Sequence, residues 1–176
     1  MAYNDQYRNA QGYGQPGGRG PAPQGNRNSR PYTPPAQPRT IEAKPIPAEY
    51  VDEAERVIAG LKEEDGGKLR ITTSKMRNFL TLVTDIYNKE SLRTEESLSP
   101  DSQLKLMRLR VRIVYDAGRD DNPNPARDEG VKRFVEKAKL LEYIKGIGSS
   151  RAEMIRFAHY MEALVAYHRF MGGKEN

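Results

Sequence analysis

Four basic residues of this chain recur on one side of a single predicted helix. They are Lys105, Arg108, Arg112 and Arg119. With about 3.6 residues per turn and about 1.5 Å per residue, they form a row roughly 20 Å long. We expect this row to be exposed, with no acid at i+3 or i+4 to neutralise it. A row of this kind suits the phosphates of a nucleic-acid backbone. The alternative is a solvated helix face that acids on neighbouring helices balance.

The same helix has two apolar sides, and the basic row lies between them. One side carries Leu104, Met107, Val111, Val114 and Gly118, and the other carries Leu106, Leu109 and Ile113. A helix that is apolar on two sides is expected to be covered on both. We therefore place it in the middle of a bundle, and we expect Tyr115 and Tyr167 to be core groups.

Two further cations lie at the start of another predicted helix, which begins at Thr72 or Thr73. They are Lys75 and Arg77. Free backbone N–H groups at a helix N-terminus also favour an anion. The candidate nucleic-acid contacts are therefore Lys75, Arg77, Lys105, Arg108, Arg112 and Arg119.

Other combinations of reactive residue types have the wrong spacing for a site. His159 and His168 are half a turn out of phase on one helix, so they cannot chelate one metal, and His168 points toward the core. The loop 120–125 begins like a calcium loop, but proline stands where glycine must turn and Val131 stands where a glutamate belongs. The sequence has no phosphate-cradling glycine loop and no cysteine nucleophile. We expect no catalysis, no metal and no cofactor.

One local motif favours a different function. Residues 144–155 resemble the helix-hairpin-helix of non-specific DNA-binding proteins, with Gly146-Ile147-Gly148 as the hairpin. Only one copy is present, and the following helix is long. A plain turn between two helices explains the glycines equally well, so a DNA-binding accessory protein and a purely structural helical adaptor remain as alternatives.

Composition divides the 176 residues into a tail, 1–46, and one domain, 47–176. The tail is rich in Gly, Pro, Gln and Arg and nearly lacks aliphatic side chains, so we expect disorder. It is either an auxiliary RNA-touching segment or a solvated extension. Most of the net charge of +5 belongs to this end, which leaves the domain nearly neutral. With no cysteine, no apolar run long enough for a bilayer and no signal peptide, a cytoplasmic protein is expected.

Apolar periodicity and caps predict an all-α bundle of about five helices. The first begins near Pro47 and ends at Gly66, the second runs from Thr72 or Thr73 to about Leu92, and the third follows the Ser99 cap to Gly118. The fourth begins near Val131 and breaks at Gly146. A capping box of Ser150 and Glu153 opens the last helix, which stops at Gly172-Gly173.

Three segments, 73–80, 114–119 and 160–174, together resemble the small subunit of the type III-A (Csm-type) CRISPR effector complex. The resemblance covers residues 50–174. It implies a non-catalytic subunit that binds guide and target RNA through its basic helices without reading sequence. It also implies self-association as a filament, beside backbone, cap and large polymerase-like subunits. The tail lies outside the resemblance.

Overall fold

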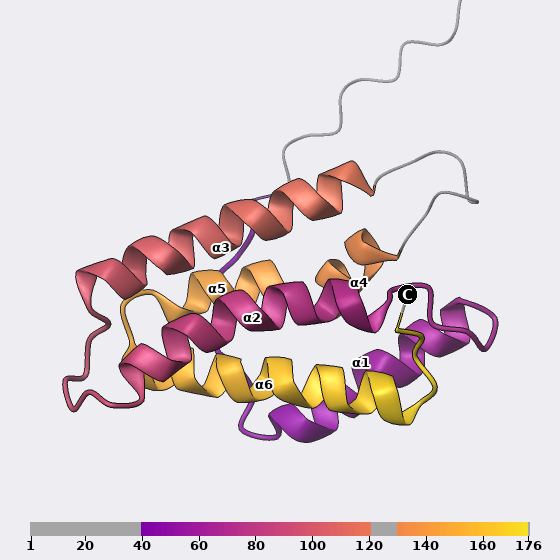
Figure 1. Ribbon diagram of the computed structural model, residues 1–176, viewed down its shortest axis with the longest axis horizontal. Coiled ribbons are helices and arrows are strands. Elements are labelled where there is room, and N and C mark those ends of the chain that lie inside the picture. The colour runs from indigo at the N-terminus through magenta and orange to yellow at the C-terminus, as the bar shows by residue number, and fades with distance from the viewer. Residues whose placement is uncertain (1–39, 121–129, 176) are drawn as a thin grey trace, which may run out of the picture. The chain divides into compact units, whose positions relative to one another are not determined.

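The computed structural model describes residues 40–120 and 130–175, and these form six α-helices without a strand (Figure 1). The helices are α1 (Tyr50–Glu64), α2 (Thr73–Glu90), α3 (Pro100–Arg119), α4 (Val131–Lys137), α5 (Leu140–Ile147) and α6 (Arg151–Phe170). The all-α prediction is confirmed. Residues 1–39, which hold most of the predicted tail, residues 121–129 and residue 176 lie outside the described residues.

The core forms around α6, which packs against α1, α2 and α5. Its buried side carries Phe157, Tyr160, Met161 and Leu164 at helical spacing. In Figure 1, α2 lies between α6 at one edge and α3 at the other. No helix in residues 40–120 and 130–175 combines the length and apolar character that a bilayer span needs.

The predicted fourth helix is two short helices, α4 and α5. Lys139 breaks them apart with a left-handed φ of 51°. The Tyr160 hydroxyl donates to the carbonyl of Ala138 at 3.2 Å, at the break, and Lys139 Nζ donates to Glu53 Oε1 at 3.0 Å. The break lets α4 pack against α3 while α5 turns toward α6. Nothing in the apolar spacing of residues 131–147 marks this position, because the pattern continues across it.

Residues 40–46, which composition assigns to the tail, pass along α5. The Lys44 amide donates to the Glu142 carbonyl at 3.1 Å, and Ile46 is buried. The backbone comes so close to α5 that a Cβ on residue 146 would overlap the carbonyl of Lys44. This close approach therefore requires glycine at position 146. It explains one glycine of the hairpin-like motif by packing, with no need for phosphate binding.

Gly146→Ala is expected to lower the free energy of unfolding by about 2 kcal/mol, because the added methyl group must push residues 40–46 away from α5. Gly118→Ala is the matched control, because nothing lies within contact distance of its Cβ and alanine favours the helix by about 1 kcal/mol. Urea unfolding of both variants measures the difference. Equal stability of Gly146→Ala and the wild type would contradict the close approach.

Candidate nucleic-acid interface

Helix α3 begins with a complete N-terminal signal. Ser99 Oγ accepts from the Ser102 amide at 3.3 Å, and Pro100 and Asp101 follow in the first turn. Its inward side buries Leu106, Leu109, Ile113 and Ala117 against the bundle. The helix therefore presents one fixed outer surface over its whole length.

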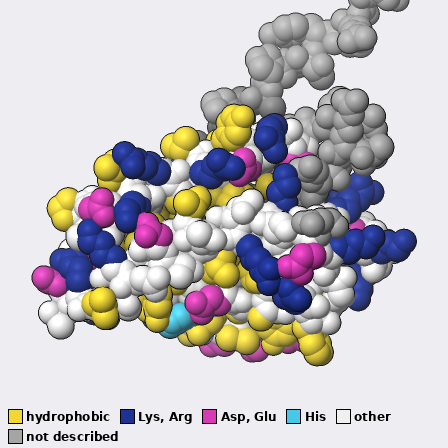
Figure 2. All heavy atoms as spheres, viewed as in Figure 1, with side chains coloured by type: hydrophobic (Ala, Val, Ile, Leu, Met, Phe, Trp, Pro, Cys, Tyr) yellow, Lys and Arg dark blue, Asp and Glu magenta, His cyan; other side chains and the backbone are white. Residues whose placement is uncertain are grey.

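The predicted basic row lies on that outer surface. Arg108 and Arg119 are exposed and make no hydrogen bond or ion pair with the residues that the structure describes. Arg112 is 56% exposed, and its Nε lies 2.8 Å from Asp116 Oδ2. Figure 2 shows Lys and Arg side chains along the α3 edge, interleaved with hydrophobic ones. Three guanidinium groups thus stay accessible to an anion.

The expectation that no acid balances the row is wrong. Asp116 lies four residues after Arg112 and pairs with it, although the prediction overlooked this spacing. Lys105 is half-buried between Asp85 of α2, at 2.7 Å, and Asp101 at 3.6 Å. The hydrogen bond to Asp85 is the main reason that the pKa of Lys105 is raised. Lys105 is therefore the most heavily compensated cation of the row.

The N-terminus of α2 is not open to an anion as predicted. The amides of Thr73 and Ser74 donate to the carbonyls of Lys174 and Glu175, at 2.8 and 3.2 Å, and the Lys75 amide donates to Thr72 Oγ1. The sequence could not indicate this cover, because residues 174–175 are about 100 positions away along the chain. The free-amide part of the prediction is wrong.

One of the two cations of α2, Lys75, lies beside the basic row nonetheless. Lys75, Arg112 and Arg119 line one small cavity of about 150 Å³ together with Asn78 and Asp116. Arg77 pairs with Glu175 at 2.5 Å and remains exposed on the outer side of α2. The structure therefore brings Lys75 to the row on α3, whereas Arg77 lies farther along α2 and is engaged by the C-terminal segment.

Two neutral polar residues of α2 lie in the same region, and the sequence prediction missed them. Asn78 and Thr81 line a shallow hollow of about 260 Å³ with Arg112. The Asn78 amide can donate to a phosphate, whereas the Thr81 hydroxyl already donates to the Arg77 carbonyl at 2.9 Å and can still accept from a ribose hydroxyl. The only sequence signal is their place, with Asp85 and Asn88, on the polar side of α2.

The second apolar side of α3 is exposed, so the prediction that both sides are packed is wrong. Val111 is 69% exposed and Tyr115 is 60% exposed, and Leu104, Met107 and Val114 are exposed with them. Tyr115 is consequently not a core group, whereas Tyr167 is partly buried. The reason is geometric, since no other helix of the described fold reaches the outer side of α3.

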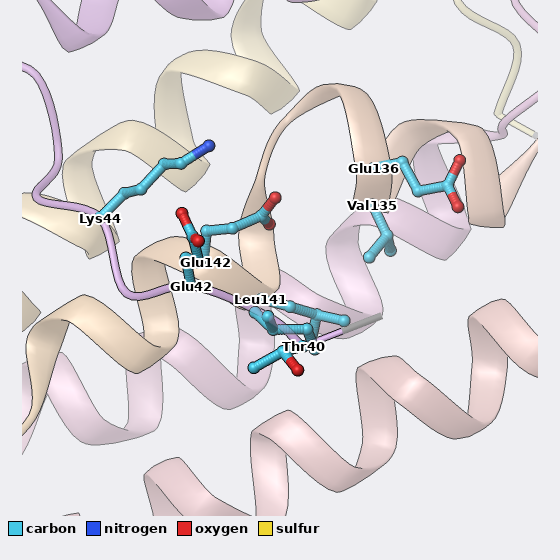
Figure 3. Close-up of a pocket in the computed structure, with 8 residues that line it drawn as sticks. Thr40, Glu42, Lys44, Val135, Glu136, Leu141 and Glu142 are labelled. Atoms are coloured by element: carbon cyan, nitrogen blue, oxygen red, sulfur yellow. The ribbon is translucent and has the colours of Figure 1, made fainter. Parts of the chain in front are cut away.

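A larger cavity lies elsewhere and has the wrong charge for RNA. It measures about 550 Å³ and is lined by side chains of residues 40–44, α4 and α5 (Figure 3). Its lining includes the carboxylates of Glu42, Glu136 and Glu142 against the single ammonium group of Lys44. These carboxylates would repel a phosphate, so the candidate site remains on α3.

Backbone groups of the hairpin-like segment are already occupied by hydrogen bonds within the fold. The Ser150 amide donates to Ile147, the Arg151 amide donates to Glu96, and the Ser149 carbonyl accepts from Leu98. Ser150 Oγ caps α6 by accepting from Glu153 N at 3.3 Å. The reciprocal bond of the predicted capping box is absent from this described turn, because the Ser150 amide donates to the Ile147 carbonyl and not to Glu153. These contacts fit a turn between two helices better than a phosphate clamp.

Comparison with known proteins gives one consistent result. The family described as Csm2 Type III-A matches residues 48–174. A CRISPR system Cms protein Csm2 of Streptococcus thermophilus is 40% identical over 126 residues, which are 72% of this chain and 93% of that protein. The Csm2 protein of Mycobacterium tuberculosis (strain CDC 1551 / Oshkosh) is 38% identical over 130 residues, 74% of this chain and 97% of its own.

Proposed function

The chain belongs to the Csm2 family, the small subunits of type III-A CRISPR effector complexes, and on this premise we propose that it binds the backbone of guide and target RNA. The observation that carries this proposal is the row of exposed guanidinium groups on α3. Arg108 and Arg119 have no partner among the residues described, and Arg112 is more than half exposed. Lys75 extends the row, and Arg77 and Lys105 contribute after exchanging their carboxylate partners for phosphate.

Recognition without sequence preference follows from the kind of contact. Guanidinium and ammonium groups that meet phosphates fix position on a strand but do not read base edges. Asn78 and Thr81, which lie beside Arg112, add hydrogen bonds to the sugar–phosphate chain. Base pairing between guide and target then supplies the sequence specificity, as in other RNA-guided effectors.

One copy of the subunit is expected to bind weakly. About four contacts to single-stranded phosphates give a slope of only about −3 for log K against log salt concentration. Several copies arrayed as a filament along the guide–target duplex raise one another's effective concentration, and the array becomes stable. Backbone, cap and large polymerase-like subunits of the complex are the partners that would hold the array in place.

We assign no catalytic step to this subunit. Four buried titratable side chains of the described fold are engaged in structural bonds: Glu90 with Ser99 and Arg93, Asp120 with Val131 and Lys132, His168 with Ile71 and Thr73, and Tyr160 with Ala138. Such groups are held away from any substrate. This supports a binding role, with RNA cleavage left to other subunits.

Replacing Arg108 and Arg119 together by glutamine is expected to weaken binding to a single-stranded RNA oligonucleotide about tenfold at low salt. Each phosphate contact contributes about 0.7 to the salt slope on a single strand, so the slope should become shallower by about 1.4. Fluorescence anisotropy across a salt series measures both quantities. The matched control removes two cations outside the row, Arg56 of α1 and Lys145 of α5, and should leave the slope unchanged.

The same assay separates the alternatives. Equal losses in the two double variants would mean that only net charge matters, and the proposed row would be wrong. A preference for DNA that depends on Gly148 would favour the helix-hairpin-helix interpretation. Unchanged RNA binding together with normal assembly of the complex would favour a purely structural adaptor.

A further inference from the structure

An apolar stripe on the outer side of α3 has no cover within the described fold. The α3 stripe consists of Leu104, Met107, Val111, Val114 and Tyr115, all exposed. Arg110 lines a shallow hollow with three of them, Met107, Val111 and Val114, and Arg108 follows the stripe on its other side. A continuous apolar surface with a charged border is typical of a protein interaction site. The border is basic, so the partner surface should be acidic.

An apolar surface with an acidic border lies on α1 and α6. The α1–α6 face consists of the exposed side chains of Val51, Asp52, Glu55, Glu162, Ala166 and Phe170. Tyr167 of α6 lies beside Glu55 and Asp52 of α1, and its pKa is raised by burial and by these two carboxylates. Phe170 is 85% exposed. Hydrophobic and acidic side chains meet along this edge in Figure 2.

The cations nearest to the α1–α6 face are already engaged. Arg56 pairs with Glu53, Arg169 pairs with Glu175, and Lys62 donates to the carbonyl of Met171. Lys62 keeps its charge, because a carbonyl does not neutralise an ammonium group, but the three carboxylates of Asp52, Glu55 and Glu162 outnumber it, so this face is acidic. Its mixture of apolar and acidic side chains is the counterpart of the apolar and basic side chains on and beside the α3 stripe.

We propose that the α3 stripe of one copy docks on the α1–α6 face of a second copy. This inference deepens the array of the proposed function, on which it rests, by assigning its two contact surfaces. Opposite charges at the border steer the two surfaces together and fix their orientation, while the apolar side chains at the centre leave water. Helices α3 and α6 lie at opposite edges of the bundle in Figure 1, so one copy can use both surfaces at once and the contact can repeat from copy to copy.

Two other occupants fit the charges less well. A symmetric contact between two α3 stripes would place Arg108 and Arg110 of one copy against the same residues of the other. Residues 1–39 of the chain itself carry five basic groups and one acidic group, so they too would meet like charge on α3. Repulsion between like charges disfavours both arrangements.

Docking engages Arg108 at the border of the stripe but leaves the rest of the RNA-binding cations beside α2 accessible. Lys75, Arg112 and Arg119 face the cavity beside α2, whereas Met107, Val111 and Val114 lie on the other flank of α3. One helix side of about 20 Å makes a small interface, so we expect fast, weak association on the order of 100 μM. A shared RNA would strengthen it by holding neighbouring copies in register.

Two full-length variants that each block one surface test the proposal in sedimentation velocity without RNA. Val111→Asp places an acid in the α3 stripe, and the double variant Glu55→Lys and Glu162→Lys reverses the α1–α6 face. The wild type should form concentration-dependent oligomers, and each variant alone should lose association about tenfold or more. An equimolar mixture should form a dimer and nothing larger, because one intact surface of each kind remains.

Two other results would overturn the proposal. Dimers formed by the double variant alone would indicate a symmetric contact between two α3 stripes. Conversion of the oligomers to monomers after removal of residues 1–39 would show that the tail makes the contact. A wild type that stays monomeric at about 1 mM, tenfold above the expected constant, also overturns it. Arg119→Gln leaves both docking surfaces intact, so its affinity for a short RNA reports on the proposed function separately. Circular dichroism confirms that each variant is folded.

Discussion

Replacing His168 by leucine is expected to lower the free energy of unfolding by about 3 kcal/mol. The imidazole is 0% exposed and bonds in two directions. Its Nε2 lies 2.8 Å from the carbonyl of Ile71, which can only accept, so Nε2 carries the proton. Its Nδ1 then accepts from the hydroxyl of Thr73 at 3.2 Å. Leucine would leave both partners buried and unsatisfied, which urea unfolding would detect.

The same side chain gives stability a defined pH dependence. Burial lowers the pKa of His168 from its ordinary value of 6.5, because a charged imidazolium is poorly solvated there. The pKa of His168 is lower in the folded than in the unfolded protein. The stabilisation by the neutral imidazole is therefore fully present above pH 6.5 and is lost as the pH falls through the folded pKa. Titration of this one side chain changes the free energy of unfolding by at most about 1.4 kcal/mol per pH unit.

The chain's other histidine provides the control. His159 is half-buried on α6, with ring centroids 6.3 Å from Tyr50 and 5.6 Å from Tyr87. His159→Leu should change stability little and retain the loss of stability below pH 6.5, whereas His168→Leu should lack that loss. A shared pH profile in the two variants would show that His168 does not titrate as argued.

The features that could be predicted from the sequence are those set by short-range patterns, such as helix caps and the buried sides of helices. The inward position of His168 follows from its place on the apolar side of the last helix, and the structure confirms it. The caps at Thr72 and Ser99 accept from amides three residues later, as their side chains predict. Helix existence and the buried sides of α1, α2 and α6 depend on the same short-range periodicity, so they can be derived without a structure.

The features that sequence reasoning missed depend on contacts between distant segments. The outer side of α3 is as apolar as a core side, and only the arrangement of the other helices shows that Val111 and Tyr115 remain exposed. Closure of the α2 N-terminus by Lys174 and Glu175, and the pairing of Lys105 with Asp85, likewise join residues far apart in sequence. The pairing of Arg112 with Asp116 is different, because its i+4 spacing was available in the sequence.

Glu90 links the candidate interface to the bundle. It is a buried carboxylate at the end of α2, and it accepts from the Ser99 amide at 3.2 Å and the Ser99 hydroxyl at 2.7 Å. Arg93 Nη1 donates to its other oxygen at 2.9 Å. Because Ser99 is the N-cap of α3, this carboxylate fixes where the helix with the basic row begins.

Glu90→Gln is expected to lower the free energy of unfolding by about 3 kcal/mol, because the amide N–H₂ group would face donors that need an acceptor. Burial alone would raise the pKa of Glu90, but hydrogen bonds from Ser102, Ser99 and Arg93 outweigh it and bring the pKa from 4.5 to about 2. The wild type should therefore lose the stabilisation by the Glu90 carboxylate as the pH falls from 4.5 through 2, and the variant should not.

Glu95→Gln is the control. It removes the exposed carboxylate that pairs with Arg93 and should unfold in urea as the wild type does. Equal effects of the two substitutions would show that Glu90 does not hold the start of α3.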